Sequence, residues 1–297
     1  MKTFRLLLRT LRQSPWLIVC TVYVMVIILL AVVGPHLTGY NYAAISDASL
    51  QPPSFAHWFG TDLNGRDLLT RTLYGARMSL LVAALGTFVS LTVGVSYGMI
   101  SGYAGGRVDS IMMRLVEILY SLPSLILVIV LVATLEKPVT TILQYLFLGS
   151  IPPRLVLLIV FLGLTEWLTM ARIIRGQVLV LKEQAFIQAS AALGQSHLRL
   201  LFRHLLPNLS GIILVYLTLT IPAIMIDEAF LSFLGLGVQP PQASWGTLIA
   251  DGAAAINPIQ LYWWLLLFPG GMMTLTLLAL NFLGDGLRDT LDPRVKK

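Results

Sequence analysis

Three acidic side chains lie in segments that are otherwise apolar. Glu166 interrupts the stretch FLGLTEWLTMARIIRG, and Asp227 and Glu228 lie in the second half of an apolar run over residues 209–236. A charged residue at the centre of a membrane helix costs roughly 2.5 to 3.5 kcal/mol on insertion scales, so these positions need a reason. We expect the three carboxylates to line a polar path and to bind positively charged groups there. The alternative is an interhelical pair, or a position that contacts water near the membrane surface.

A second polar stretch, QASAALGQSHLRLLFRHLLPN, covers residues 188–208. Gly194 can take the left-handed conformation that ends a helix over about 183–193, and Ser196 can cap a second one. Pro207 lacks a backbone donor and is expected to end this second helix. One apolar stripe of the second helix, at i, i+3, i+4 and i+7, consists of Leu198, Leu201, Phe202 and Leu205. The pattern predicts a helical hairpin, which either contacts another protein or lies flat on the membrane surface with its arginines toward lipid phosphates.

No combination of residues indicates catalysis or metal binding. The histidines, at positions 36, 57, 197 and 204, lack a metal-binding spacing such as H-E-x-x-H. No catalytic triad of Ser, His and Asp can be assigned from the sequence. The phosphate loop G-x-x-x-x-G-K-[ST] is missing from the sequence, so the chain is not expected to hydrolyse ATP itself. We therefore expect no catalytic residue, no metal site and no cofactor bound by this chain.

The segment GTDLNGRD, from Gly60 to Asp67, places two glycines and two aspartates close together. A metal site is conceivable, but the spaced carboxylates of a calcium loop are missing. We expect instead a turn that leads into an interfacial helix, in which Arg66, Asp67 and Arg71 pair locally.

The composition indicates an integral membrane protein. The chain has 297 residues, of which 57% are hydrophobic and 11% are charged, whereas soluble domains carry roughly 25% charged residues. Backbone groups in lipid must be satisfied within the segment, so each apolar run should be a helix. The apolar runs are 16–37, 79–101, 115–135, 155–173, 209–236 and 261–284. The sequence therefore predicts an all-α membrane protein with six transmembrane helices.

The distribution of basic residues predicts the orientation of these helices. With the N-terminus inside, fifteen lysines and arginines fall in the inner segments and five in the outer segments. Cytoplasmic loops carry the excess of Lys and Arg, so both termini are expected in the cytoplasm. The polar stretch 188–208 is then a cytoplasmic hairpin between spans four and five. The net charge of +6 is spread over these loops, which does not indicate a nucleic-acid partner.

Several longer motifs carry a resemblance to a known family. They are GTDLNGRDLLTRTLYGARMSL (60–80), SGYAGGRVDSIMMRLVEILYSLP (101–123), ARIIRGQVLVLKEQAF (171–186), FLSFLGLGVQPP (230–241) and LNFLGDGLRDTLDPR (280–294). Together they resemble the dipeptide and oligopeptide permease subunits of ABC importers, and most closely the second, shorter oligopeptide permease subunit. The polar stretch resembles the cytoplasmic signature loop of these subunits, Glu-Ala-Ala, three residues, Gly, nine residues, then Ile-x-Leu-Pro. The matching positions are Gln188, Ala189, Ser190, Gly194, His204, Leu206 and Pro207.

The resemblance implies a transport function that this chain shares with partners. It implies a permease subunit that translocates peptides across a bacterial inner membrane, paired with a second permease subunit. Two ABC ATPase subunits would bind ATP and Mg and would dock on the coupling segment at about 183–208. An extracytoplasmic peptide-binding protein would deliver the substrate to the outer loops. Glu228, with Asp227 and Glu166, would face the translocation path and meet the amino terminus or basic side chains of a peptide.

The resemblance also implies a division of the chain. Residues 1–78 would hold a cytoplasmic segment, the first transmembrane helix and an outer loop, and residues 79–297 the permease core with five transmembrane helices. Two alternatives remain open at this point. The same machinery could import nickel or another small solute, or the chain could be a stand-alone secondary transporter that uses its own intramembrane charges.

Overall fold

The computed structural model describes residues 15–146, 151–257 and 260–291. Within these ranges the ordered elements are helices, and β-structure is limited to one isolated bridge between Thr61 and Asp67. Six helices are long and apolar enough to cross a membrane, which confirms the predicted all-α class with six spans. The helices are α2 (Pro15–Leu37), α3 (Leu68–Ala104), α4 (Gly106–Tyr120), α5 (Ser124–Tyr145), α6 (Pro153–Lys182), α7 (Ala185–Ala192), α8 (His197–Arg199), η1 (Leu200–Leu205), α9 (Leu206–Phe233), α10 (Trp245–Ala254) and α11 (Trp264–Leu291).

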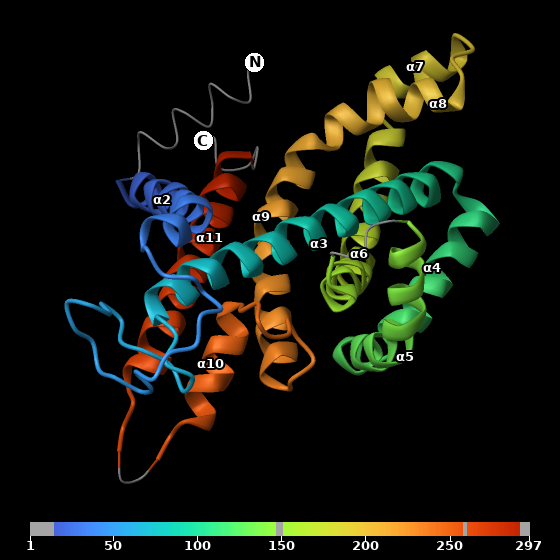
Figure 1. Ribbon diagram of the computed structural model, residues 1–297. Coiled ribbons are helices and arrows are strands. Elements are labelled where there is room, and N and C mark those ends of the chain that lie inside the picture. The colour runs from blue at the N-terminus through green and yellow to red at the C-terminus, as the bar shows by residue number, and fades with distance from the viewer. Residues whose placement is uncertain (1–14, 147–150, 258–259, 292–297) are drawn as a thin grey trace.

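The long helix α3 runs diagonally across the molecule and is its structural centre (Figure 1). It packs most extensively on α6, and glycines allow the two helices to approach closely. A Cβ atom at Gly94 would lie 2.7 Å from the Cβ of Met170, and one at Gly98 would lie 2.5 Å from the carbonyl oxygen of Ala171. Small residues at such contacts are typical of membrane helices, whose association depends on close packing. The close approach of α3 and α6 therefore depends on Gly94 and Gly98.

The third predicted span, 115–135, is wrong in its position. The chain breaks after Tyr120, and α5 begins at Ser124 with Pro123 at its N-cap. Proline restricts the residue before it and cannot donate a backbone hydrogen bond, so the helix ends there and a new one starts. The spanning helix is therefore α5, which continues to Tyr145.

The second span starts earlier than predicted, at Leu68 instead of residue 79. The side chain of Asp67 caps α3 by accepting a hydrogen bond from the backbone N–H of Thr70 at 2.8 Å. This satisfies one of the free N–H groups at the helix N-terminus. The segment 60–67 is thus a turn, as expected, but it leads directly into a transmembrane helix and not into an interfacial one.

Two of the spanning helices lie mostly at the surface of the molecule. Only 17% of the most apolar window of α2 and 11% of that of α5 is buried inside this chain. The hydrophobic core is formed mainly by α3, α6 and α9, for example by Ala83, Leu158 and Ile224, all of which are fully buried. The apolar outer faces of α2 and α5 suit contact with lipid tails or with another membrane subunit.

Candidate functional sites

The helices α7 and α8 form a hairpin at the opposite end of the molecule from α10 (Figure 1). Gly194 lies in the turn between them with φ +77°, the left-handed conformation that the sequence predicts. No atom outside its neighbours would lie within 4 Å of a Cβ atom at Gly194, so the glycine is needed for its backbone conformation and not for space. Ile187 is the one buried residue of α7. The first leg of the hairpin therefore presents most of its surface outward.

The residues of the signature pattern on the first leg are accessible. Gln188 and Ala189 are exposed, and Ser190 is half-buried, with its hydroxyl donating to the carbonyl oxygen of Phe186 at 2.8 Å. Leu193, beside the turn, is 84% exposed although it is apolar. An exposed surface of small residues with a large apolar side chain at its tip is suited to contact with another protein.

The second leg of the hairpin differs from the expectation in one respect. Pro207 does not end it, because α8, the π-helical turn η1 and α9 form one continuous helix, and Pro207 lies in the first turn of α9. The π-helical turn directly before Pro207 replaces the regular i→i+4 bonds by i→i+5 bonds, as in the bond from the N–H of Leu206 to the carbonyl oxygen of Leu201, and such an interruption accommodates a residue without an N–H. The hairpin is therefore joined without interruption to the fifth span, up to Phe233.

The predicted apolar stripe is confirmed for two of its four residues. Leu205 is buried and Leu201 packs against the same core cluster, but Leu198 and Phe202 are 67% and 61% exposed. Leu200 and Leu209, which the stripe did not include, are buried. A π-helical turn has i→i+5 hydrogen bonds, so it shifts the buried face from the 3.6-residue register used in the prediction. The shift leaves Phe202 available on the surface of the hairpin. The side chain of His204 turns back toward the loop, with 3.0 Å between its Nε2 and Oε1 of Gln195.

Polar contacts that the sequence did not predict fix the base of the hairpin. The hydroxyl of Tyr103, at the end of α3, is hydrogen-bonded to Nδ1 of His197 at 2.7 Å. The ammonium group of Lys182 donates to the carbonyl oxygen of Tyr103 at 2.7 Å. Asp109 of α4 accepts two hydrogen bonds from Arg175 of α6, at 2.6 and 2.5 Å. The first contact joins α3 to the hairpin, the second joins α6 to α3, and the third joins α4 to α6. Their partners lie too far apart in the sequence to be recognised there.

The ion pair of Asp109 gives a first prediction, for Asp109→Asn. The hydrogen bonds from Arg175 hold the pKa of Asp109 below its ordinary value, against the opposing effect of burial. Because this pKa is depressed, the pair contributes its full stabilisation of the fold above the ordinary carboxyl pKa. The stabilisation is lost as pH falls through the pKa of Asp109 in the folded state. We expect Asp109→Asn to cost about 1 to 2 kcal/mol, since Arg175 is partly exposed.

The measurement is thermal unfolding of the purified chain in mild detergent at pH 7 and below pH 3.8, the ordinary pKa of an aspartate. The variant should unfold at a lower temperature than the wild type at pH 7, and the difference should shrink in acid. Equal unfolding temperatures at pH 7 would show that the pair does not stabilise the fold. Asp285→Asn, at an exposed position of α11, is the matched control.

The three predicted path carboxylates fall into two groups. Glu166 of α6 and Asp227 of α9 are both half-buried, and the two helices pack against each other. Within the described ranges neither carboxylate has a hydrogen-bond or ion-pair partner. The structure therefore leaves both acids partly open and unpaired on two neighbouring helices.

Glu228 lies in a different environment and is completely buried. Its Oε2 accepts a hydrogen bond from Ser79 at 3.0 Å and its Oε1 accepts one from Ser232 at 2.7 Å. The hydroxyl of Ser79 in turn accepts from the backbone N–H of Trp245 at 3.2 Å. Ser232 lies 3.3 Å from the hydroxyl of Ser244, which caps α10. Glu228 thus connects α3, α9 and the first turn of α10, which is the interhelical alternative.

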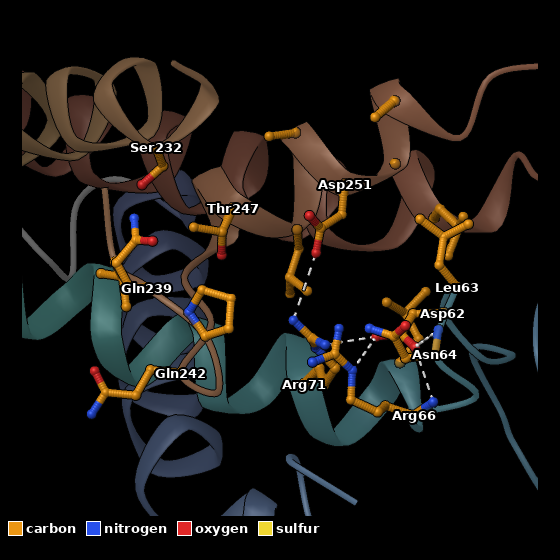
Figure 2. Close-up of a pocket in the computed structure, with 18 of the residues that line it drawn as sticks. Asp62, Leu63, Asn64, Arg66, Arg71, Ser232, Gln239, Gln242, Thr247 and Asp251 are labelled. Carbon is orange, nitrogen blue, oxygen red and sulfur yellow. Dashed lines mark hydrogen bonds and ion pairs between the residues drawn. The ribbon is translucent and has the colours of Figure 1, made fainter. Parts of the chain in front are cut away.

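A pocket of 510 Å³ lies between the N-terminal end of α3 and α10, and Figure 2 shows its polar side chains. Asp62 is the centre of its charged network. The carboxylate of Asp62 accepts from Nε of Arg66 at 2.7 Å and from Nη1 of Arg71 at 2.6 Å. Asp251 of α10 lies 3.7 Å from Nη2 of Arg71. We call this site the α3–α10 pocket.

The α3–α10 pocket corrects one detail of the predicted pairing. Arg66 and Arg71 pair with Asp62, and not with Asp67 as expected. Asp67 instead caps α3 and lies 2.9 Å from Nδ1 of His57. Oδ1 of Asp62 also accepts hydrogen bonds from the backbone N–H groups of Asn64 and Arg66 in the same turn. In the described part of the chain, no group of three or more metal-binding side chains is present.

The comparisons with known proteins cover nearly the whole chain. Residues 94–297 match the family model of the binding-protein-dependent transport system inner membrane component. Residues 2–53 match the N-terminal transmembrane domain of oligopeptide transport permease C.

Curated relatives also match most of this chain. The oligopeptide transport system permease protein OppC of Bacillus subtilis is 44% identical over 96% of this chain and 88% of its own length. The dipeptide transport system permease protein DppC of the same organism is 45% identical over 90% of this chain and 78% of its own. OppC of Escherichia coli K12 is 44% identical over 93% of this chain and 86% of its own. This chain therefore belongs to the family of binding-protein-dependent transport system inner membrane components.

Proposed function

We propose that this chain is the permease subunit of an ATP-driven peptide importer in a bacterial inner membrane. The observation that carries the proposal is the similarity of almost the full chain to oligopeptide and dipeptide permeases at 44 to 45% identity. Similarity to these relatives favours peptides as the substrate over nickel or another small solute. It also favours a permease that works in a complex with other subunits over a stand-alone secondary transporter. The chain works with a second permease subunit, two ABC ATPases that hold ATP and Mg, and an extracytoplasmic peptide-binding protein.

Uptake of a labelled peptide into reconstituted vesicles tests this proposal. The complete complex is placed in vesicles with the binding protein and peptide on the outside. Uptake should require ATP inside the vesicles and should persist when ionophores remove all ion gradients. Uptake that follows an ion gradient and ignores ATP would instead identify a secondary transporter.

The α7–α8 hairpin is the proposed contact with the ATPases. Gln188, Ala189 and Leu193 are accessible there, and Phe202 is exposed on the second leg. The second leg continues as α9 across the membrane, so a movement of the hairpin displaces the whole fifth span. The hairpin is then cytoplasmic, as the distribution of basic residues predicts, and the α3–α10 pocket lies on the outer side.

Glu166 and Asp227 are the proposed carboxylates of the translocation path. They are partly accessible, lie on two helices that pack against each other and have no ion-pair partner within the described chain. An ammonium group of a passing peptide would be attracted to either carboxylate. For Glu228, complete burial among three helices favours a structural role.

The double variant Glu166→Gln/Asp227→Asn tests the path. We expect uptake of lysine-containing peptides to fall about three- to tenfold relative to uptake of acidic peptides of equal length, since the loss of a favourable charge pair is worth about 1 kcal/mol. The measurement is the maximal uptake rate for both peptides at saturating binding protein. An equal change for basic and acidic peptides would contradict the proposed charge recognition.

A further inference from the structure

The α3–α10 pocket contains guanidinium donors that the chain itself does not use. Nε of Arg71 is buried and has no hydrogen-bond partner within the described residues. Arg66 donates from Nε to Asp62, which leaves its two terminal amino groups without a partner among the same residues. Buried polar groups are normally hydrogen-bonded, and an unpaired one is costly. These donors are therefore available to a ligand.

The acidic groups of the pocket differ in how firmly they are held. Asp62 accepts four hydrogen bonds, two from backbone N–H groups and two from the arginines, so its charge is compensated. Among the described residues Asp251 has one ion pair, the 3.7 Å contact with Nη2 of Arg71, and its side chain is 51% exposed. Figure 2 shows Asp251 reaching from α10 toward Arg71 across the pocket. Another carboxylate that offers better geometry could take its place.

The rim of the pocket indicates a protein ligand. The volume of 510 Å³ does not decide this, because it is more than a single small anion requires but is also typical of small-molecule sites. Leu63 and Phe233 line it and are 46% and 55% exposed, and the neighbouring Leu234 is 48% exposed. Arginine surrounded by apolar side chains is a composition typical of protein–protein interfaces.

We infer that the α3–α10 pocket receives an acidic side chain of the docked extracytoplasmic binding protein, which pairs with Arg66 and Arg71 and displaces Asp251. The inference rests on the proposed function, which places the pocket on the side from which the binding protein approaches. Arginine binds a carboxylate with two parallel hydrogen bonds, so the pair supplies orientation as well as attraction. Asp251 then acts as a competitor that occupies Arg71 until docking.

The competition predicts opposite effects for two substitutions. Arg66→Gln removes free donors and should raise the Kd of the binding protein about tenfold, as expected for an interface arginine. Asp251→Asn removes the competing carboxylate and should lower the Kd by about threefold. Lys137→Gln is the matched control, because Lys137 is exposed, is expected on the same side of the membrane and lies outside the pocket.

The experiment measures binding of the purified, peptide-loaded binding protein to the complete transporter complex in lipid nanodiscs. Unchanged Kd values for both pocket variants would overturn the inference, as would a Lys137→Gln effect as large as that of Arg66→Gln. If the complex with Arg66→Gln does not assemble, the Kd of the complex with Asp251→Asn is the test. A Kd that is not lower than that of the wild type would then overturn the inference.

Two further outcomes are distinguishable. If Arg66→Gln slows peptide uptake at saturating binding protein without changing the Kd, the carboxylate belongs to the peptide and the docking inference is wrong. If the wild-type complex does not bind the binding protein at all, the proposed function itself fails, independently of the pocket variants.

Discussion

Replacing Gly194 by arginine is expected to reduce ATP-driven peptide uptake by about 10- to 100-fold while the chain remains inserted in the membrane. Gly194 has φ +77°, and a residue with a side chain is strained there by roughly 1 to 2 kcal/mol. The space around it is open, so the long side chain does not disturb the chain's own packing. It projects instead from the tip of the hairpin, where the ATPase is proposed to dock.

Gly194→Asn is the matched control for backbone strain. Asparagine tolerates the left-handed conformation better than other residues with a side chain, and it is short. We expect Gly194→Asn to retain most of the uptake, because the turn is kept and little bulk is added. The measurement is uptake of a labelled peptide per amount of inserted chain. Equal uptake by the wild type and Gly194→Arg would show that the tip of the hairpin does not contact a partner.

Replacing Glu228 by leucine should destabilise the packing of α10 by about 2 to 4 kcal/mol. Leucine removes the acceptor of Ser79 and Ser232 in a completely buried site. The hydroxyl proton of Ser79 then loses its partner, and Ser232 keeps only its 3.3 Å contact with Ser244. Ser79 also accepts from the backbone N–H of Trp245, so the start of α10 depends on the same network. Glu228→Gln keeps the shape and one acceptor oxygen and should cost about 1 kcal/mol.

Hydrogen exchange of residues 244–254, followed by mass spectrometry, measures this effect directly. Glu228→Leu should exchange faster in this segment, and Asp227→Asn, one position away and half-buried, should not. Wild-type exchange in Glu228→Leu would contradict the structural role. A change in the preference for basic peptides in Glu228→Gln, without faster exchange, would return Glu228 to the translocation path.

The parts of the fold that depend on local sequence could be predicted. The apolar runs identify the spanning helices because lipid leaves the backbone no other partner. Gly194 could be assigned to a left-handed turn because glycine takes that conformation without strain. The break before α5 was missed although Pro123 signals it, because the apolar character continues across the proline and was given more weight.

The parts that depend on tertiary contacts could not be predicted. The π-helical turn at Leu200–Leu205 changes which leucines are buried, and a helical period of 3.6 residues cannot indicate that change. The environment of Glu228 combines serines from three helices, and the partner of Asp109 lies 66 residues away. The pairing with Asp62 could not be predicted for a different reason, since Asp67 is closer to Arg66 and Arg71 in the sequence and only the folded turn brings Asp62 to both arginines.

We propose that partner ATPases drive this chain through the α7–α8 hairpin. The most direct test is purification of the chain in mild detergent from its native membrane, with the accompanying proteins identified by mass spectrometry. Wild type, Gly194→Asn and Gly194→Arg are compared at equal amounts. We predict a second permease in all three samples and P-loop ATPases in the first two, with the ATPases lost from Gly194→Arg. A chain that is purified alone, or ATPases retained equally in all three, would contradict the claim.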